Sequence, residues 1–202
     1  MEYLDLSGTI LLSHGGGGVR TSELIRDIVR RHLGNPILDR MDDAACLPPF
    51  PRTLVFTTDS YVIDPLFFPG GDIGRLAVCG TVNDLAMQGG APRALSLGLI
   101  LEEGLLIRDL DRILESVGVT ASELDVPVVT GDTKVVERGR GNGAYLNTSG
   151  IGERLPGVDL HAGNAQPGDV VLVSGSIGDH GAAVMLCRAQ LGLQSELFSD
   201  VA

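Results

Sequence analysis

The chain has 202 residues, of which 44% are hydrophobic and only 4% aromatic, so its core must be aliphatic. A formal net charge of −11 and a pI near 4.6 argue against nucleic acid or an anionic membrane as partner, because both require a basic face. Glycine, at 28 residues, is about twice as common as usual, which predicts loops that bring backbone close to a ligand. An acidic protein that binds an anion such as ATP also needs a cation at the contact.

The lack of a membrane span or signal peptide and the arrangement of the cysteines favour a cytoplasmic protein. No stretch reaches the roughly 18 apolar residues of a membrane span, and residues 1–12 lack the basic start of a signal peptide. Cys46, Cys79 and Cys187 match neither a disulfide framework nor a zinc spacing, so we expect buried thiols in a reducing compartment.

The first predicted element is a helix of about ten residues behind the glycine run Gly15–Gly18. Its apolar residues recur at helical spacing, and Gly34-Asn35-Pro36 ends it. A β-branched strand is predicted from Arg52 to Asp59, followed by a helix of small residues from Asp72 to Gln88.

The next elements alternate between strand and helix. A buried strand is predicted from Ala94 to Leu101, then a helix around Leu110 to Val117. Strands from Val126 to Thr130 and from Ala144 to Ile151 follow, and we expect a Gly/Arg hairpin over Glu137–Gly143 to join them. This order predicts an α/β (α+β) domain whose helices cover one sheet face.

A domain boundary is predicted near Leu155-Pro156-Gly157. Beyond it we expect a strand from Asp169 to Ser174 and a helix that carries Ala183, Leu186 and Leu191. One strand and one helix cannot bury a core of their own. The sequence therefore divides into residues 1–155 and an incomplete second α/β domain, residues 156–202.

The glycine run Gly15, Gly16, Gly17 and Gly18 can present backbone N–H groups to phosphate oxygens. It is neither a Walker loop nor a GxGxxG motif, and a flexible connector is the alternative. His14, directly before the run, could also hydrogen-bond phosphate.

Four aspartates form the candidate metal site: Asp43, Asp59, Asp84 and Asp132. Three of the four lie at or beside predicted strand ends, whereas Asp84 lies in the predicted helix of small residues. Mg²⁺ takes carboxylate and phosphate oxygens. Any one of them could instead be a helix cap or a turn residue. Lys134 could neutralise a β- or γ-phosphate, or be a solvated surface lysine.

The order of these motifs resembles the aminoimidazole ribonucleotide synthetase superfamily and, within it, the HypE family of hydrogenase maturation proteins. The superfamily motifs are the glycine run, Asp42-Asp43-Ala44-Ala45, Thr57-Thr58-Asp59, Asn83-Asp84, Gly131-Asp132-Thr133-Lys134 and Ser174-Gly175 through Gly178-Asp179-His180-Gly181. Asp59–Gly71, Cys79-Gly80-Thr81, Leu101-Glu102-Glu103-Gly104 and Val129–Val136 are similar to HypE.

The resemblance implies a four-stranded amino-terminal sheet that pairs with its twin into a β-barrel homodimer, with ATP in a cleft lined by both domains. It implies Asp43, Asp59, Asp84 and Asp132 as Mg²⁺-facing acids, and Asn83, Lys134 and Gly15–Gly18 as nucleotide contacts. The implied reaction is ATP-dependent dehydration of a cysteine-bound S-carboxamide to a thiocyanate, the cyanide source for [NiFe] hydrogenase. Implied partners are the carbamoyltransferase HypF and the iron-carrying scaffold HypC/HypD.

Several alternatives stay open. HypE-like chains end in a Pro-Arg-Ile-Cys type tail, whereas this one ends at Asp200-Val201-Ala202, so we expect a partial chain without the acceptor cysteine and do not assign that role to Cys187. The base for the amide nitrogen is unassigned. A thiamine-monophosphate kinase-like phosphotransferase and a non-catalytic dimerisation or docking module are the rival functions.

Overall fold

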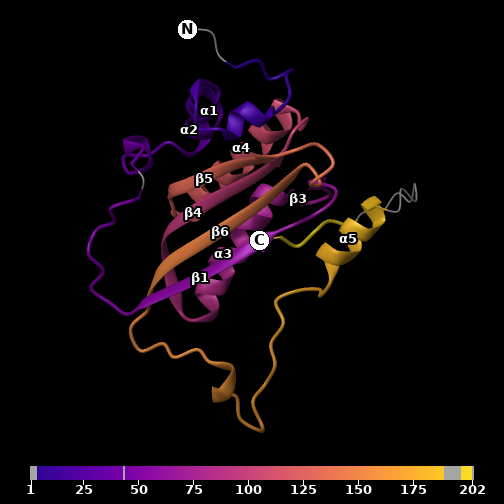
Figure 1. Cartoon of the computed structure of the whole chain (residues 1–202). Coiled ribbons are helices and arrows are strands. Elements are labelled where there is room, and N and C mark those ends of the chain that lie inside the picture. The colour runs from indigo at the N-terminus through magenta and orange to yellow at the C-terminus, as the bar shows by residue number, and fades with distance from the viewer. Residues whose placement is uncertain (1–3, 43, 189–196, 202) are drawn as a thin grey trace.

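The computed structural model describes residues 4–42, 44–188 and 197–201 and is built around a four-stranded mixed sheet (Figure 1). The strands are β1 (Leu54–Tyr61), β4 (Gly90–Glu102), β5 (Val128–Val136) and β6 (Ala144–Arg154), in the order β1-β6-β4-β5. β4 and β5 run parallel, and the other two pairings are antiparallel.

The two faces of the sheet differ because side chains alternate along each strand. Leu95, Leu97, Leu99 and Leu101 of β4 all point to one face and are buried in the aliphatic core. The opposite face carries the residues between them and their cross-strand neighbours on β6, such as Ser96 opposite Ser149. This second face is called the open face below.

Two long helices cover the buried face, as the alternation of elements predicts. α3 (Ile73–Met87) packs against β1, β6 and β4, and α4 (Ile107–Glu123) packs beside it. Both lie behind the sheet in Figure 1, and no described helix crosses the open face turned to the viewer. α3 begins where expected, because the Asp72 carboxylate accepts the N–H groups of Gly74 and Arg75.

The first helix is longer than the sequence predicts. It comprises α1 (Val19–Leu24), a π-helical turn (Ile25–Val29) and α2 (Arg30–Leu33), and it packs against α4. A 3-10 turn (Leu12–Gly15) precedes it and a second one (Leu38–Arg40) follows. Gly34 ends the helix, as its position in the sequence indicates.

Two strand predictions need correction. β5 continues to Val136, so Asp132 and Lys134 lie within a strand instead of after it. Residues 137–143 do not form a hairpin, because β5 and β6 lie on opposite sides of β4 and the connection must cross its end. Local propensity cannot reveal this, since strand order depends on contacts remote in sequence.

The carboxy-terminal region contains α5 (Asp179–Arg188), a 3-10 turn (Ala162–Asn164) and a contact with the small β2–β3 hairpin (Phe67–Phe68 and Gly71–Asp72). The strand predicted over residues 169–174 is wrong: Val170, Val171 and Leu172 are exposed coil. No described strand lies beside them to receive their backbone hydrogen bonds. The predicted helix is confirmed to Arg188, and its extension to Leu191 falls outside the described residues.

Cys79 is buried, but Cys46 and Cys187 are exposed, contrary to the expectation of three buried thiols. Within the described part of the chain, no helix has the length and apolar character to cross a bilayer.

Candidate functional site

A pocket opens at the β5 edge of the sheet, between the glycine run and the first helix. Its interior is apolar and includes Ile25, Leu97 and Leu99, while Thr21, Asp132 and Lys134 add polar groups to its lining. The cavity holds about 200 Å³, below the roughly 300–1,000 Å³ of common small-molecule pockets. It can therefore receive only part of a ligand as large as a nucleotide.

Asp132 and Lys134 form an ion pair at this pocket. Lys134 Nζ lies 3.0 Å from Asp132 Oδ1, and both side chains are about two-thirds exposed. They share one face of β5 because they are two residues apart. An exposed pair contributes roughly 0–1 kcal/mol, so either partner can exchange the other for a ligand at small cost.

The glycine run meets β5 at Gly15. A Cβ on Gly15 would stand 2.6 Å from the Val135 nitrogen, so only glycine permits this approach. The Gly17 N–H donates to Thr21 Oγ1 at 2.9 Å, and Gly17 has a φ of 78°, in the left-handed region. The run is thus closely packed at Gly15 and open around Gly18.

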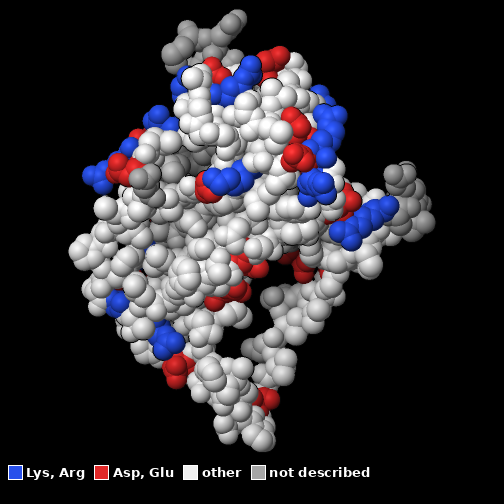
Figure 2. Space-filling view, in the orientation of Figure 1, with Lys and Arg blue, Asp and Glu red and all other residues white. Residues whose placement is uncertain are grey.

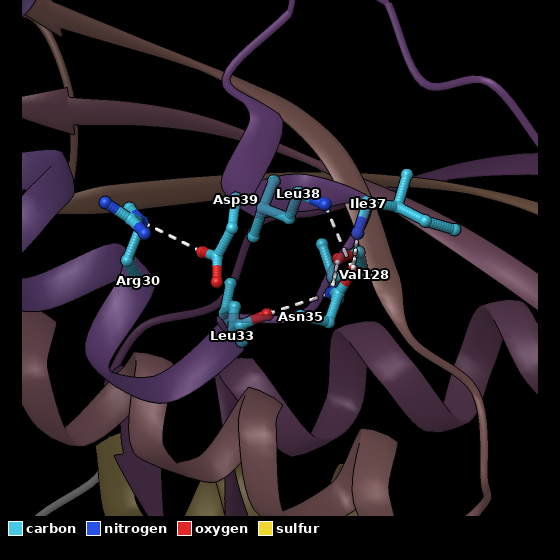
Figure 3. A network of polar contacts seen from close by, with 7 residues as sticks. All are labelled: Arg30, Leu33, Asn35, Ile37, Leu38, Asp39 and Val128. Carbon is cyan, nitrogen blue, oxygen red and sulfur yellow. Dashed lines mark hydrogen bonds and ion pairs between the residues drawn. The ribbon is translucent and has the colours of Figure 1, made fainter.

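The far wall of the pocket is held by a polar network around Asn35 (Figure 3). The Asn35 amide donates to the carbonyls of Leu33 and Val128, at 3.0 and 2.7 Å, and its oxygen accepts the N–H groups of Ile37 and Leu38. These bonds tie the end of the first helix to the first residue of β5 and fix the shape of the pocket.

A second group of predicted residues lies at the other edge of the sheet. Asp84 on α3 accepts a hydrogen bond from Thr57 on β1 at 3.0 Å. Asp59, two residues further along β1, lies on the same face as Thr57. Its carboxylate accepts a hydrogen bond from the backbone N–H of the next residue, Ser60. Asn83 and Asp84 are both exposed on α3. Sequence reasoning did not identify Thr57 as the partner of Asp84.

The predicted acids do not meet within one chain. Asp59 and Asp132 lie on opposite edge strands, three strand spacings apart, which is about 14 Å at roughly 4.8 Å per spacing. Asp59 faces the side of α3, whereas Asp132 lies in the row of Gly98 on the open face. Among the described residues, no three His, Cys, Asp or Glu side chains lie together as a metal site requires. Asp43 lies outside the described residues.

His14 does not point to a ligand, contrary to the role suggested by its place before the glycine run. Its side chain is 1% exposed and Nδ1 accepts the Leu11 N–H at 3.0 Å. Burial is the main cause that lowers the pKa of His14 below its usual value. The sequence offers no clear signal for this, since a histidine beside glycines occurs both in sites and in cores.

Glu102 also has a role that sequence analysis missed. Its carboxylate accepts the N–H groups of Gly139 and Gly143, at 2.5 and 2.9 Å, and so holds the connection from β5 to β6. These bonds keep the pKa of Glu102 below its usual value. The connection begins directly after β5, so Glu102 also limits the freedom of the strand end near Lys134.

The chain is similar over almost its whole length to HypE proteins. The carbamoyl dehydratase HypE of Azotobacter vinelandii is 50% identical over 201 residues, which cover 99% of this chain and 59% of that protein. A crystal structure of the hydrogenase maturation protein HypE in complex with ATP has a TM-score of 0.92 at 49% identity, over 96% of this chain and 58% of that one. A crystal structure of a HypE–HypF complex has a TM-score of 0.71 at 46% identity, over 91% and 58%.

A rival from the same superfamily is more distant. The thiamine-monophosphate kinase of Stenotrophomonas maltophilia K279a matches at 27% identity with a TM-score of 0.64, over 83% of this chain and 53% of that one. This chain spans less than two thirds of the length of the HypE proteins that it matches.

Residues 41–153 match the family model for the N-terminal domain of AIR synthase related proteins. This match spans β1, β4, β5, β6 and both long helices, with Asp59, Asp84 and Asp132 among them. The chain therefore belongs to the family of AIR synthase related proteins and contains its N-terminal domain.

Proposed function

We propose that this chain is the ATP-binding and dimerisation portion of a HypE-type carbamoyl dehydratase. The whole enzyme would dehydrate a protein-bound S-carboxamide to an S-thiocyanate, for the cyanide ligands of [NiFe] hydrogenase. The observation that carries the proposal is the pocket at β5, where the glycine run lies beside Asp132 and Lys134. The similarity to a HypE bound to ATP supports it.

The groups at the pocket suit Mg²⁺-ATP. Asp132 offers a carboxylate to a divalent cation that also binds phosphate oxygens, and Lys134 offers a positive point charge to the same oxygens. Only part of the nucleotide would enter a cavity of about 200 Å³. We propose that the rest contacts groups outside it, including Asp59, Asn83, Asp84 and Asp43.

A homodimer through the open face would supply those groups. Leu54, Phe56 and Ile100 are exposed there, and Figure 2 shows mostly uncharged surface over the sheet with charged residues around it. If two open faces pack about a two-fold axis along the strands, β1 of one copy lies opposite β5 of the other. Asp132 of one copy, on the open face, would then lie opposite the edge strand of the other copy that carries Asp59 on its α3 side.

The region after the sheet is proposed to begin the second domain. The apolar run Val170–Val173 is exposed coil, and apolar side chains of this number are normally buried against further structure. We therefore keep residues 1–155 as the ATP-binding and dimerisation domain and residues 156–202 as the start of the next.

The proposed chemistry follows from the poor leaving ability of an amide oxygen. ATP would phosphorylate that oxygen, and Mg²⁺ and Lys134 would offset the charge that develops on the transferred phosphoryl group. HypF is the proposed source of the carbamoyl group, with the HypE–HypF complex of a similar chain in support. HypC/HypD is the proposed acceptor of the cyanide.

A thermal-shift experiment tests the nucleotide site. At an Mg²⁺-ATP concentration about 100-fold above Kd, binding adds about 2.7 kcal/mol and raises the Tm by roughly 5–10 °C. Asp132→Asn and Lys134→Met should each weaken binding by about tenfold or more, because each removes a charged contact. Glu115→Gln, an exposed change on α4, is the matched control.

The outcome also separates the rival functions. No shift of the wild-type Tm at millimolar Mg²⁺-ATP would contradict the nucleotide site and favour a docking module. An additional shift with thiamine monophosphate would favour the kinase-like reading, for which the overall likeness to thiamine-monophosphate kinase is the supporting observation.

A further inference from the structure

His14 closes the 3-10 turn that leads into the glycine run. The Leu11 N–H donates to His14 Nδ1 at 3.0 Å, and the His14 N–H donates to the Leu11 carbonyl at 2.9 Å. The side chain is buried at 1% exposure, so water does not compete for these bonds. The turn is therefore held by a reciprocal pair of bonds between two residues.

The bond to Leu11 fixes the protonation state of the ring. Nδ1 accepts a hydrogen bond, so the proton of the neutral imidazole must sit on Nε2. Nε2 is buried and has no hydrogen-bond partner among the described residues. The imidazole thus makes one side-chain hydrogen bond, and loss of that bond would leave it with none.

The position of this 3-10 turn determines where the glycine run lies. Ile10 is fixed to the neighbouring segment, with its N–H donating to the Leu105 carbonyl and its carbonyl accepting the Gly104 N–H. On the other side, Gly15 packs on the Val135 backbone of β5. His14 lies between these two attachments and shapes the chain that joins them.

We infer that His14 is the positioning residue of the glycine run: as a neutral imidazole it keeps Gly15 packed on β5, and as an imidazolium it releases Gly15 and the glycines that follow it. The imidazolium carries an N–H on both nitrogens, so Nδ1 would face the Leu11 N–H donor to donor. Protonation would also place a positive charge in a buried site, where the Nε2–H group has no hydrogen-bond acceptor among the described residues. The consequence for nucleotide binding rests on the proposed function, but the release of the turn does not.

The charged surroundings set the pH at which release occurs. α1 contributes Arg20, which disfavours the imidazolium, and Glu23, which favours it. The charged residues of β5, Asp132 and Lys134, are paired with each other. Burial and Arg20 outweigh Glu23 and lower the pKa of His14, so the ring is neutral and the turn closed at pH 7.5, and a fall in pH shifts the equilibrium towards the open turn.

Hydrogen exchange of the whole chain without nucleotide tests the release directly. Between pH 7.5 and pH 5, the protection factor of the Leu11 amide should fall by about tenfold or more, while that of a core amide such as Leu97 stays constant. In His14→Asn, the Asn Oδ1 replaces Nδ1 as acceptor and does not titrate, so protection should persist at pH 5. In His14→Ala, protection should be low at both pH values.

Wild-type protection that is independent of pH, or the same pH profile in wild type and His14→Asn, would overturn the inference. If the variants do not fold, long-range ¹H–¹⁵N NMR of wild-type His14 still tests it, since a neutral ring with its proton on Nδ1 contradicts the assigned bond.

Nucleotide affinity provides the second readout. Wild type should lose more affinity for Mg²⁺-ATP between pH 7.5 and pH 5 than His14→Asn, since the titration of ATP itself is common to both. If wild type binds no ATP at pH 7.5 but the exchange result holds, the proposed function fails and the role of His14 in the turn stands.

Discussion

At the scale of single residues, the neighbours of a side chain decide its role more than its type does. Gly15 and Gly18 are three positions apart in one glycine run, yet Gly15 has the β5 backbone against it and Gly18 has nothing within 4 Å. Asp72 caps α3, whereas Asp84, on the same helix, is exposed and binds Thr57 across to β1. The sequence alone presents these pairs as equivalent.

Substitution of Gly15 should therefore be far more damaging than substitution of Gly18. In Gly15→Ala, the new methyl group would meet the Val135 nitrogen at 2.6 Å and lift the turn from β5. We expect a loss of roughly 1–3 kcal/mol in the free energy of unfolding and weaker nucleotide binding. Gly18→Ala meets no atom within 4 Å and has an extended backbone conformation, so it should reduce both much less than Gly15→Ala does.

Urea titration and ATP-dependent thermal shifts of the two variants provide the measurement. Equal behaviour of both variants would show that the run does not pack on β5 in solution.

At the scale of elements, the ends of the strands carry the functional geometry. β5 continues through Asp132 and Lys134, and the connection that follows is held by the Glu102 carboxylate at the end of β4. The Gly/Arg composition of residues 137–143 indicates a loop, but only the sheet order shows that this loop crosses β4 to reach β6.

The contribution of Glu102 should depend on pH. Its folded-state pKa is lowered from 4.5, first by the Gly143 N–H and then by the Gly139 N–H. A depressed carboxyl pKa stabilises the folded state above the unfolded pKa, and this stability is lost as the pH falls through the folded value. Glu102→Gln should thus be less stable than wild type at pH 7, with a difference that shrinks below about pH 4.5.

Urea unfolding of both proteins from pH 7 to pH 3.5 measures this difference. If the two proteins differed in the free energy of unfolding by the same amount at every pH, the charged form of Glu102 would not be what stabilises residues 139–143. The control is Asp125→Asn. The Asp125 carboxyl is exposed, and among the described residues it accepts no hydrogen bond from a backbone N–H.

At the scale of the whole molecule, the unequal faces of the sheet indicate an assembly. Helices cover one face, and the other exposes Leu54, Phe56 and Ile100 together with hydroxyl and amide groups such as Asn147 and Ser149. A monomer of this form keeps apolar strand residues in water, and the predicted metal acids remain at opposite edges.

A charge placed on the open face should therefore prevent dimerisation. Phe56 is 65% exposed, and burial of its side chain in both copies would contribute about 3 kcal/mol or more. Phe56→Glu should weaken the dimer by roughly a hundredfold or more. Val119→Glu, on the far side of the molecule on α4, is half-exposed in the monomer and should have no effect.

Sedimentation equilibrium at micromolar concentrations distinguishes the two variants. A wild-type chain that stays monomeric at those concentrations would contradict the proposed interface for this chain.

The sequence by itself predicted the elements and the types of residue that a site could use. Periodicity and glycine spacing predict α3, α4 and the four strands, because these signals act between residues near in the chain. The bounds of α3 are predicted closely, whereas α4 and β5 both extend beyond their predicted carboxy-terminal ends. The same residues indicate a phosphate- and Mg²⁺-binding protein and a resemblance to HypE. The family match and the similarity to HypE proteins confirm that resemblance.

Only the tertiary structure decided how those residues are arranged. It placed Asp59 and Asp132 on opposite edges, turned His14 inward and left residues 169–174 unpaired. Each result depends on contacts between segments that are distant in sequence, where strand order and burial compete with local preference. A motif therefore predicts which groups a site uses, while the packing of the sheet decides which of them one chain can bring together.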